Sequence, residues 1–554
     1  MTNLSYVCGV GTEPLLYKTV GAVLEDAAAR WGEREALIVR HQNIRWTYRE
    51  LDEAADRLAA GLLQLGLVPG DRIGIWAPNR YEWVVTQFAS AKAGLILVTI
   101  NPAYRTSELE YALNKVGCKA LVLAPSFKTS DYAAMLDQIR SKVPLLRAAI
   151  LTDDAPRPGF LRYADVASSG TAQDLARVRE LRSQLQPEDA INIQFTSGTT
   201  GLPKGATLSH HNIVNNGYFV AKRMTFTEND RLCIPVPLYH CFGMVMGVLG
   251  CATHGAAMVF AGEAFEPKSL LEAVEAERCT ALYGVPTMFI AELEHAEFKR
   301  YDLRTLRTGV MAGAPCPVEV MKRVISDMHM KEVTICYGMT ETSPVSFQSC
   351  RDDTLEQRVT TVGTIHPHLE VKIVDPETGG IVSHDTTGEL CTRGYSVMLG
   401  YWREPERTTE AIDGAGWMHT GDLATMDAQG FVNIVGRLKD MIIRGGENVY
   451  PREVEEFLYA HPDIVDVQVI GVPDLKYGEE IMAWVKLRSG AVPLDADAVR
   501  RFCLGRIAHY KIPRYVQVVE EFPMTVTGKV QKYVMRVQAI ELLGLQQADH
   551  VATA

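Results

Sequence analysis

The sequence lacks the cysteine spacing of a metal ribbon and the N-terminal pattern of a secreted chain. Its 11 cysteines include no Cys-x-x-Cys pair, which excludes a zinc ribbon and a thioredoxin-like motif. Most of them, such as Cys336, lie in apolar runs, which is typical of buried free thiols in a reducing compartment. Residues 1–6 have neither the basic start nor the apolar stretch of a signal peptide. We therefore expect a cytoplasmic location.

The sequence also has no block of basic residues. It contains 56 Lys and Arg against 67 Asp and Glu, a net charge of −11. The sequence therefore shows no basic region of the kind that binds nucleic acid, and we expect no nucleic-acid partner. The positive charge needed for an anionic substrate must therefore be local. Hydrophobic residues make up 47% and charged residues 22%, which excludes disorder, collagen and coiled coil for the whole chain.

One uncharged stretch has the length of a membrane span. Residues 232–262 contain no Asp, Glu, Lys or Arg, and they exceed the roughly 20 residues that a bilayer requires. Two prolines, two histidines and five glycines interrupt the stretch. It instead predicts a buried helix near 242–253, a glycine stop at Gly255 and a strand over 256–261. We expect no integral membrane association.

The first 350 residues alternate strand and helix signals. A strand is expected over 71–76, a helix over 81–93 and a second strand over 95–100. A further helix is expected with Ser107 as its N-cap and Glu110, three residues on, completing a capping box, and it is expected to end near Gly117. Similar alternation runs through residues 185–345, and such spacing predicts parallel sheets covered by helices.

The pattern changes after residue 360. Short strand-like runs separated by Gly-rich turns predict a small β-barrel-like subdomain, and an α+β unit of about 110 residues is expected after Arg437. The sequence thus predicts a multidomain α/β protein: a large N-terminal domain of two parallel α/β subdomains plus the small β-subdomain, and a mobile C-terminal α+β domain. At 554 residues the chain is too long for one hydrophobic core.

A Gly-, Ser- and Thr-rich loop follows the strand expected over 191–195. It contains Thr196, Ser197, Gly198, Thr199, Thr200, Gly201 and Lys204. Glycines permit close backbone approach, hydroxyls donate hydrogen bonds and a lysine adds positive charge, as a triphosphate cradle requires. The spacing is not that of a Walker A loop. Composition alone leaves a polar surface loop as an equal alternative.

Six segments in one order resemble the motifs of the adenylate-forming superfamily of acyl-CoA synthetases, aryl-CoA ligases, peptide-synthetase adenylation domains and luciferases. The segments are residues 196–205, 312–315, 337–342, 420–422, 436–451 and 523–529. The resemblance covers essentially the whole chain. Residues 104–121 and the run around His240 are most similar to the medium-chain fatty acyl-CoA synthetase branch.

The resemblance implies binding sites for ATP, Mg²⁺ and coenzyme A. The implied ATP-binding residues are Thr196, Ser197, Gly198, Thr199, Thr200, Gly201, Lys204, Gly313, Ala314, Pro315, Tyr337, Gly338, Met339, Thr340, Asp422, Arg437 and Lys529. Thr199 and Glu341 are the implied Mg²⁺ ligands. Lys529, Thr199, Glu341 and His240 are the implied catalytic residues. Gly445 and Gly446 are expected to bind coenzyme A.

The resemblance also implies the domain boundaries and the reaction. An N-terminal AMP-binding domain would cover residues 1–437, a hinge residues 438–440 with Lys439 at its centre, and a C-terminal domain residues 441–554. A carboxylate would attack the α-phosphate of ATP, which gives an acyl-adenylate and pyrophosphate, and the thiol of coenzyme A would then expel AMP. An acid of ordinary pKa is already ionised at neutral pH, so this attack requires no general base.

The expected acyl pocket is apolar. Its residues are His240, Phe242, Met244, Val285 and Met288. Segments 239–247 and 284–289, which hold these residues, contain no Arg or Lys to pair with a second carboxylate, so a dicarboxylic acid is disfavoured. A methionine-rich wall favours a flexible aliphatic chain over a rigid aryl acid. Plain core packing stays open as an alternative interpretation of the same residues.

Several alternatives stay open and others do not. An aryl-acid CoA ligase, an acyl-AMP ligase that loads a carrier protein, and a non-catalytic nucleotide and fatty-acid binding protein remain possible, as does a homodimer. A dehydrogenase is disfavoured because Pro14 replaces the third glycine after Gly9 and Gly11, and no Gly-x-Ser-x-Gly motif of a serine hydrolase occurs. His210 and His211 resemble an acyltransferase motif without its acid, and Ser209 as a helix N-cap explains that segment better.

Overall fold

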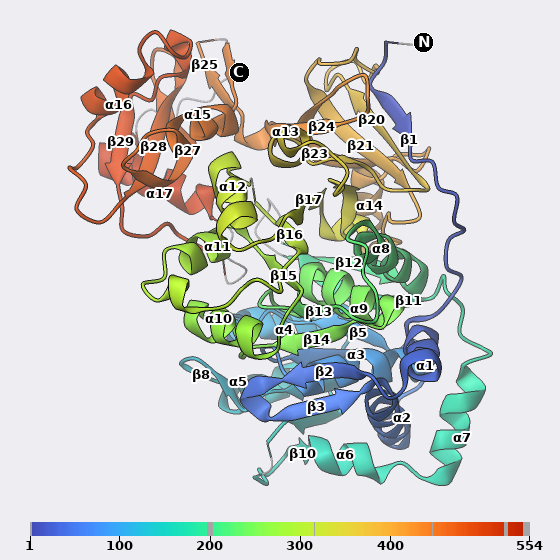
Figure 1. Ribbon diagram of the computed structural model, residues 1–554. Helices are drawn as coiled ribbons and strands as arrows, with labels where there is room; N and C mark the ends of the chain where they lie inside the picture. The colour runs from blue at the N-terminus through green and yellow to red at the C-terminus, as the bar shows by residue number, and fades with distance from the viewer. Residues whose placement is uncertain are drawn as a thin grey trace.

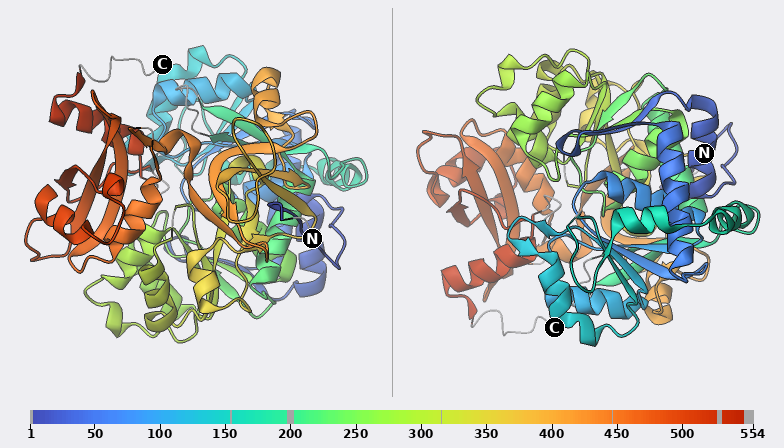
Figure 2. Two further views of the ribbon diagram at one scale, coloured as in Figure 1. Left: turned by 90° about the horizontal axis from the view of Figure 1, so that it is seen from above. Right: turned by 90° about the horizontal axis from the view of Figure 1, so that it is seen from below.

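The computed structural model describes residues 3–153, 155–196, 203–314, 316–445, 447–525 and 530–546. The N-terminal part of the chain contains an eight-stranded, a nine-stranded and a five-stranded sheet and the two-stranded pair of β7 (Ser126–Phe127) and β8 (Ser130–Asp131). A further sheet lies in a C-terminal unit. Figure 1 shows that unit, coloured orange to red, at the upper left, with the five-stranded N-terminal sheet at the upper right. In both views of Figure 2 the C-terminal unit projects from one side of the N-terminal part.

The first large sheet has eight strands. In spatial order they are β10 (Leu161–Arg162), β9 (Ala148–Leu151), β6 (Ala120–Leu123), β4 (Arg72–Trp76), β5 (Ile96–Thr99), β11 (Ala190–Thr196), β12 (Lys204–Ser209) and β22 (Gly400–Tyr401). The pairings from β10 to β11 are parallel. Strand β12 runs antiparallel to β11, and β22 runs antiparallel to β12. The last strand comes from a segment almost 200 residues beyond its partner, a pairing that the sequence did not reveal.

The second large sheet has nine strands. In spatial order they are β19 (Thr364–Ile365), β18 (Val345–Gln348), β17 (Glu332–Gly338), β16 (Thr308–Ala312), β15 (Ala281–Gly284), β13 (Arg231–Cys233), β14 (Ala257–Phe260), β2 (Glu35–Val39) and β3 (Ile44–Thr47). The six strands from β17 to β2 are parallel, and antiparallel strands close both edges. One continuous hydrophobic cluster contains side chains from both large sheets, such as Ile75 of β4 and Tyr283 of β15.

The third sheet is antiparallel. Its strands are β1 (Tyr6–Cys8), β20 (Leu369–Val374), β21 (Gly388–Gly394), β23 (Met418–Met426) and β24 (Val432–Arg437). Within the described residues, no pairing joins β1 to β24, so this β-subdomain is an open sheet. The N-terminal strand β1 supplies one edge of a sheet that is otherwise built from residues 369–437.

The C-terminal unit is an α+β structure, as predicted. Its strands are β25 (Ile442–Arg444), β26 (Glu447–Val449), β27 (Ile464–Asp474), β28 (Gly478–Leu487) and β29 (Tyr515–Val518). Its helices are α15 (Pro451–Tyr459), α16 (Ala496–Cys503) and α17 (Lys532–Leu543). These sheets and helices confirm the predicted multidomain α/β class.

The uncharged stretch 232–262 folds inside the protein. It forms the buried π-helical segment η3 (Phe242–Leu249), the helix α9 (Gly250–His254) and then β14. Gly255 ends α9 with φ at +74°, a left-handed conformation that suits glycine, so the predicted stop is confirmed. Of the helices that the structure describes, none combines the length and the apolar character needed to cross a membrane.

Two predicted helix caps have different outcomes. The hydroxyl of Ser209 accepts a hydrogen bond from the backbone N–H of Asn212 and begins α8 (His210–Arg223), as predicted. The prediction for Ser107 is wrong, because the N-cap of helix α4 (Thr106–Val116) is Arg105, two residues earlier. There the carboxylate of Glu108 accepts a hydrogen bond from the backbone N–H of Arg105 at 2.8 Å. This bond caps the N-terminal end of the helix at Arg105, so Ser107 lies inside the first turn.

A buried lysine joins the helices that cover the first sheet. Lys92 ends α3 (Tyr81–Lys92), and its side chain is 1% exposed. Its ammonium lies 2.6 Å from Asp52 of α2 (Tyr48–Gln64) and also pairs with Asp56 of the same helix and, at 3.7 Å, with Glu25 of α1 (Val20–Trp31). Burial raises the pKa of Asp52 and of Glu25, and the charge of Lys92 opposes both rises; Arg182, 2.6 Å from Glu25, is a second cation there.

Replacing this lysine should destabilise the N-terminal part. We expect Lys92→Met to cost about 3 kcal/mol, because three partly buried carboxylates lose their common partner. Such a loss corresponds to a fall in the thermal unfolding midpoint of about 3–4 °C for a unit of more than about 400 residues, because the entropy of unfolding grows with chain length. Lys142→Met is the control, since Lys142 is 59% exposed and its bridge to Glu110 is worth less than about 1 kcal/mol. Equal midpoints for the two variants would contradict the prediction.

Candidate active site

A hairpin holds the two ends of the Gly-, Ser- and Thr-rich loop side by side. Thr196 ends β11, Lys204 begins β12, and the two residues are paired in register across the antiparallel ladder. Both therefore lie at the same edge of the eight-stranded sheet. The predicted ligands between them, which are Ser197, Gly198, Thr199, Thr200 and Gly201, lie outside the described residues.

The carboxylate of Glu341 lies against the first of these ends. Glu341 belongs to the short helical turn η5 (Thr340–Thr342), between β17 and β18, and is 5% exposed. Its Oε1 accepts a hydrogen bond from the Tyr401 hydroxyl at 2.9 Å and from Thr196 Oγ1 at 3.3 Å. Carboxylate and hydroxyl oxygens suit Mg²⁺, so the donor set fits the predicted metal role of Glu341.

Tyr401 is a site residue that the sequence analysis missed. Its hydroxyl accepts from Lys204 Nζ at 3.1 Å and donates to Glu341, and the same ammonium lies 4.3 Å from the centroid of its ring. Burial and the neighbouring carboxylate raise its pKa, so the phenol keeps its proton at neutral pH. Only the pairing of β22 with β12 brings Tyr401 here, and no local pattern around residue 401 indicates it.

A second polar cluster joins the nine-stranded sheet to the β-subdomain. Asp422 of β23 accepts from the Tyr337 hydroxyl at 2.6 Å, and Arg437 Nε lies 3.2 Å from its other oxygen. Asp422 and Arg437 are paired in register on β23 and β24. Burial raises the pKa of Asp422, whereas Arg437 and Tyr337 oppose the rise. The structure thus brings together three predicted ATP-binding residues, and the carboxylate can accept from two hydroxyl groups of a ligand.

The remaining predicted nucleotide residues follow two adjacent parallel strands. Gly313, with φ at +89°, and Ala314 come directly after β16, while Gly338 ends β17 and Met339 and Thr340 follow it. A Cβ atom at Gly338 would lie 1.7 Å from the carbonyl oxygen of Pro344, so only glycine fits this turn. The carboxyl ends of parallel strands meet at one edge, the usual binding edge of such sheets. Pro315 lies outside the described residues.

The expected acyl-pocket residues cluster in the shared core. Phe242 and Met244 lie on η3, and Val285 and Met288 lie at the start of α11 (Pro286–Leu293). All four are buried in the hydrophobic cluster between the large sheets. His240 comes just before η3, where its Nδ1 accepts from the backbone N–H of Phe242 at 3.2 Å. The structure assembles an apolar wall, and its role in binding an acid stays a prediction.

The predicted hinge is a short helical turn that directly follows β24. It is η6 (Leu438–Asp440), and Lys439 is its central residue. The C-terminal unit contacts the β-subdomain beside it, because Arg452 Nη1 donates to the carbonyl oxygen of Ile434 at 2.6 Å. Gly445 has φ at +60°, and its N–H donates to the carbonyl oxygen of Tyr477. Gly446 and Lys529 lie outside the described residues.

Comparison with known families identifies this arrangement. Residues 24–402 match the family described as AMP-binding enzyme, and residues 453–529 match the AMP-binding enzyme C-terminal domain. The chain belongs to the AMP-binding enzyme family. The resemblance inferred from the six ordered motifs is thereby confirmed.

Individual relatives of this AMP-binding enzyme align along nearly the whole chain. The human mitochondrial medium-chain acyl-CoA ligase ACSF2 is 48% identical over 560 residues, which cover 98% of this chain and 91% of the relative. Among solved structures, the anthranilate CoA ligase AuaEII in complex with anthranoyl-AMP has a TM-score of 0.86 at 27% identity, covering 96% of this chain and 99% of its own. ATP-bound MatB from Rhodopseudomonas palustris has a TM-score of 0.83 at 29% identity, covering 94% and 99%.

The contacts of Tyr401 lead to a prediction for nucleotide binding. We expect Tyr401→Phe to raise the Kd for a non-hydrolysable ATP analogue with Mg²⁺ about tenfold or more, because a hydrogen bond to a charged group contributes about 1.5–3 kcal/mol. Isothermal titration calorimetry measures the change. Tyr17→Phe is the matched control, since Tyr17 is exposed and donates to Glu188 on the surface. An unchanged Kd in Tyr401→Phe would show that the phenol does not support the site.

Proposed function

We propose that this AMP-binding enzyme is an AMP-forming acyl-CoA synthetase that activates a medium-chain fatty acid. The acid carboxylate attacks the α-phosphate of ATP, pyrophosphate leaves, and an acyl-adenylate forms. The thiol of coenzyme A then attacks the adenylate carbonyl and expels AMP. The names of relatives that are 48% identical along the chain support this choice of acid and of acceptor.

The observation that carries the proposal is the buried carboxylate of Glu341 beside the end of the phosphate loop. It lies within hydrogen-bond distance of Thr196 and Tyr401, and Lys204 is held at the same tyrosine. Bringing one anion onto another requires positioning and positive charge more than proton transfer. Glu341 and Thr199 would hold Mg²⁺, which supplies charge at the phosphates, and Lys204 adds a second positive group.

The other ends of the substrates are assigned on the same basis. Asp422 would accept from the ribose hydroxyls, since Arg437 and Tyr337 hold its carboxylate in place. The apolar wall around Met244 and Met288 would line the acyl chain, with His240 at its entrance. Lys529 would bridge the acyl carboxylate and the phosphate, and Gly445 and Gly446 would contact coenzyme A. We also propose a cytoplasmic location, and the oligomeric state stays open.

The first test measures pyrophosphate release with ATP and Mg²⁺ over a series of acids. The series runs from acetate to palmitate and adds benzoate and 4-coumarate, each with and without coenzyme A. We expect octanoate and decanoate to be best, with AMP turnover rising when coenzyme A is present, because a flexible apolar wall without charge suits an aliphatic chain.

Each other outcome identifies a different function. A maximum on aryl acids would preserve the mechanism and overturn the assignment of the acid. A rate of pyrophosphate release that is the same with and without coenzyme A would indicate a carrier-protein acceptor. The absence of release with any acid would contradict the synthetase and favour a non-catalytic binding protein.

The hinge assignment leads to a prediction that separates the two half-reactions. A hinge residue must absorb a large change in φ and ψ, and proline fixes φ near −65°. We therefore expect Lys439→Pro, in the middle of η6, to retain acyl-adenylate formation and to slow thioester formation. Single-turnover adenylate formation and coenzyme A-dependent AMP release measure the two steps. Lys439→Ala, which keeps backbone freedom, is the control, and equal losses in both steps for the proline variant would contradict the hinge.

A further inference from the structure

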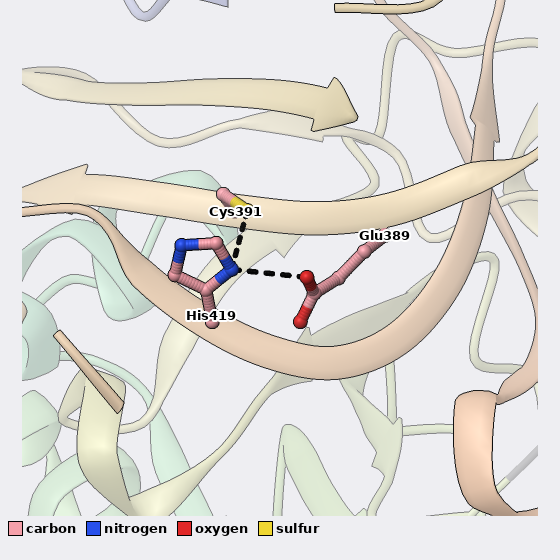
Figure 3. A group of neighbouring side chains, drawn as sticks. All are labelled: Glu389, Cys391 and His419. Atoms are coloured by element: carbon pink, nitrogen blue, oxygen red, sulfur yellow. Dashed lines mark hydrogen bonds and ion pairs between the residues drawn. The ribbon is translucent and has the colours of Figure 1, made fainter. Parts of the chain in front are cut away.

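A group of metal-ligating side chains lies in the β-subdomain, apart from the phosphate loop. Glu389 and Cys391 are two positions apart on β21, so their side chains point to one face of the sheet. His419 lies on the neighbouring strand β23 and is paired directly with Cys391. Figure 3 shows the imidazole between the thiol and the carboxylate, with Nδ1 directed at both. Nothing in the proposed reaction uses these three residues.

The distances within this group are close to those of a tetrahedral metal site. His419 Nδ1 lies 3.5 Å from Cys391 Sγ and 2.9 Å from Glu389 Oε2, and the three ligand atoms lie within 4.8 Å of one another. Zinc bonds of about 2.3 Å to sulfur and about 2.0 Å to nitrogen place those two atoms roughly 3.5 Å apart in a tetrahedron. The thiol and the imidazole thus have the required spacing already. The nitrogen–oxygen distance of 2.9 Å is a few tenths of an ångström shorter than the roughly 3.3 Å that two zinc bonds of about 2.0 Å set in a tetrahedron.

The far side of the imidazole faces a second carboxylate. Asp413 Oδ2 lies 3.9 Å from His419 Nε2, and backbone N–H groups of Ala415 and Trp417 hold Asp413 in place at 2.9 Å. Metal-bound histidines usually direct their other nitrogen at a carboxylate or carbonyl in this way. The 3.9 Å separation is that of an ion pair and not of a hydrogen bond, so Glu389, at 2.9 Å from Nδ1, is the nearer partner of the imidazole. A cation at Nδ1 replaces this hydrogen bond and leaves the single N–H of the neutral ring on Nε2, directed at Asp413.

Charge and burial limit which cation can bind. Burial and Glu389 raise the pKa of Cys391 to about 12, and Lys372, its cross-strand partner on β20, opposes the rise. The thiol must release its proton to become a ligand, so the ion must have a high affinity for thiolate. Mg²⁺ prefers oxygen ligands and does not meet this condition, whereas Zn²⁺ does. Cys391 is buried, but His419 is 35% exposed and gives access from solvent.

We propose that Glu389, Cys391 and His419 form a binding site for one Zn²⁺ ion, with water as the fourth ligand. Glu389 binds through one oxygen only, because its Oε1 accepts from the backbone N–H of Gly421 at 3.1 Å. The Cys391 proton leaves to the solvent as the sulfur–zinc bond forms. The site is separate from the Mg²⁺ site expected at Glu341, and it does not depend on the proposed function.

Zinc and cobalt titrations of the full chain test this site. The protein is reduced, stripped with EDTA and titrated with Zn²⁺ against a chromophoric chelator, without nucleotide. We expect one ion per chain, and a loss of affinity of at least about 10–100-fold in Cys391→Ala and in His419→Gln, since weakening even an outer-shell partner costs that much. Asp413→Asn should weaken binding by about tenfold. With Co²⁺, the wild type should show a thiolate-to-metal charge-transfer band that Cys391→Ala lacks.

A matched cysteine variant distinguishes this site from an accidental one. Cys8 is the exposed free cysteine of the chain, and Cys8→Ala should leave both the zinc affinity and the cobalt band unchanged. Loss of the band in Cys8→Ala, its persistence in Cys391→Ala, or no tight binding by the wild type would each overturn the proposal. If Cys391→Ala fails to fold, as circular dichroism would show, the cobalt spectra of the wild type, Cys8→Ala and Asp413→Asn still decide.

Discussion

The buried carboxylate of Glu341 is the constraint on which the rest of the site depends. It lies on a turn of the nine-stranded sheet, yet its hydrogen-bond donors, Thr196 and Tyr401, both belong to the eight-stranded sheet. A buried charge is costly unless it is hydrogen-bonded and compensated. The two sheets must therefore keep one relative position, in which Lys204 supplies positive charge through Tyr401. The same position places both ends of the phosphate loop beside a potential Mg²⁺ ligand.

The β-subdomain presents its own carboxylate through an irregular strand. Between residues 419 and 423, β23 has four steps where the facing segment of β21, from 389 to 391, has two. The extra residues bulge outward with Gly421 in the left-handed region at φ +69°, so that Asp422 reaches Tyr337. Glu389 supports the bulge by accepting from the N–H of Gly421. Strand β23 thus carries Asp422, the aspartate proposed to bind the nucleotide, and near its start His419 of the inferred zinc site.

The path of the chain links this aspartate to the hinge. Arg437 pairs with Asp422 and is also the last residue of β24, so the turn η6 begins at the next position. Any rotation of the C-terminal unit about the proposed hinge at residues 438–440 would start beside Asp422, which we propose to bind the ribose. The contact of Arg452 with Ile434 lies across the same junction, and its hydrogen bond must break if the unit turns away. The proposed nucleotide site and the proposed hinge therefore share one short segment.

The sequence by itself determined whatever is encoded in short, contiguous patterns. The six ordered motifs identified the family, alternating strand and helix signals predicted the parallel sheets, and the stop at Gly255 and the cap at Ser209 were correct. The N-cap of α4 was harder to predict from the sequence, because Glu108 and Glu110 are two residues apart and either carboxylate could accept from a backbone N–H at the helix start. In the structure Glu108 does so. Only the tertiary structure decided which distant segments meet. Tyr401 reaches Glu341 and Lys204, and His419 reaches Glu389 and Cys391, only because strands far apart in sequence become neighbours. Such pairings depend on how whole sheets bury their apolar faces, a condition that no short stretch of residues contains.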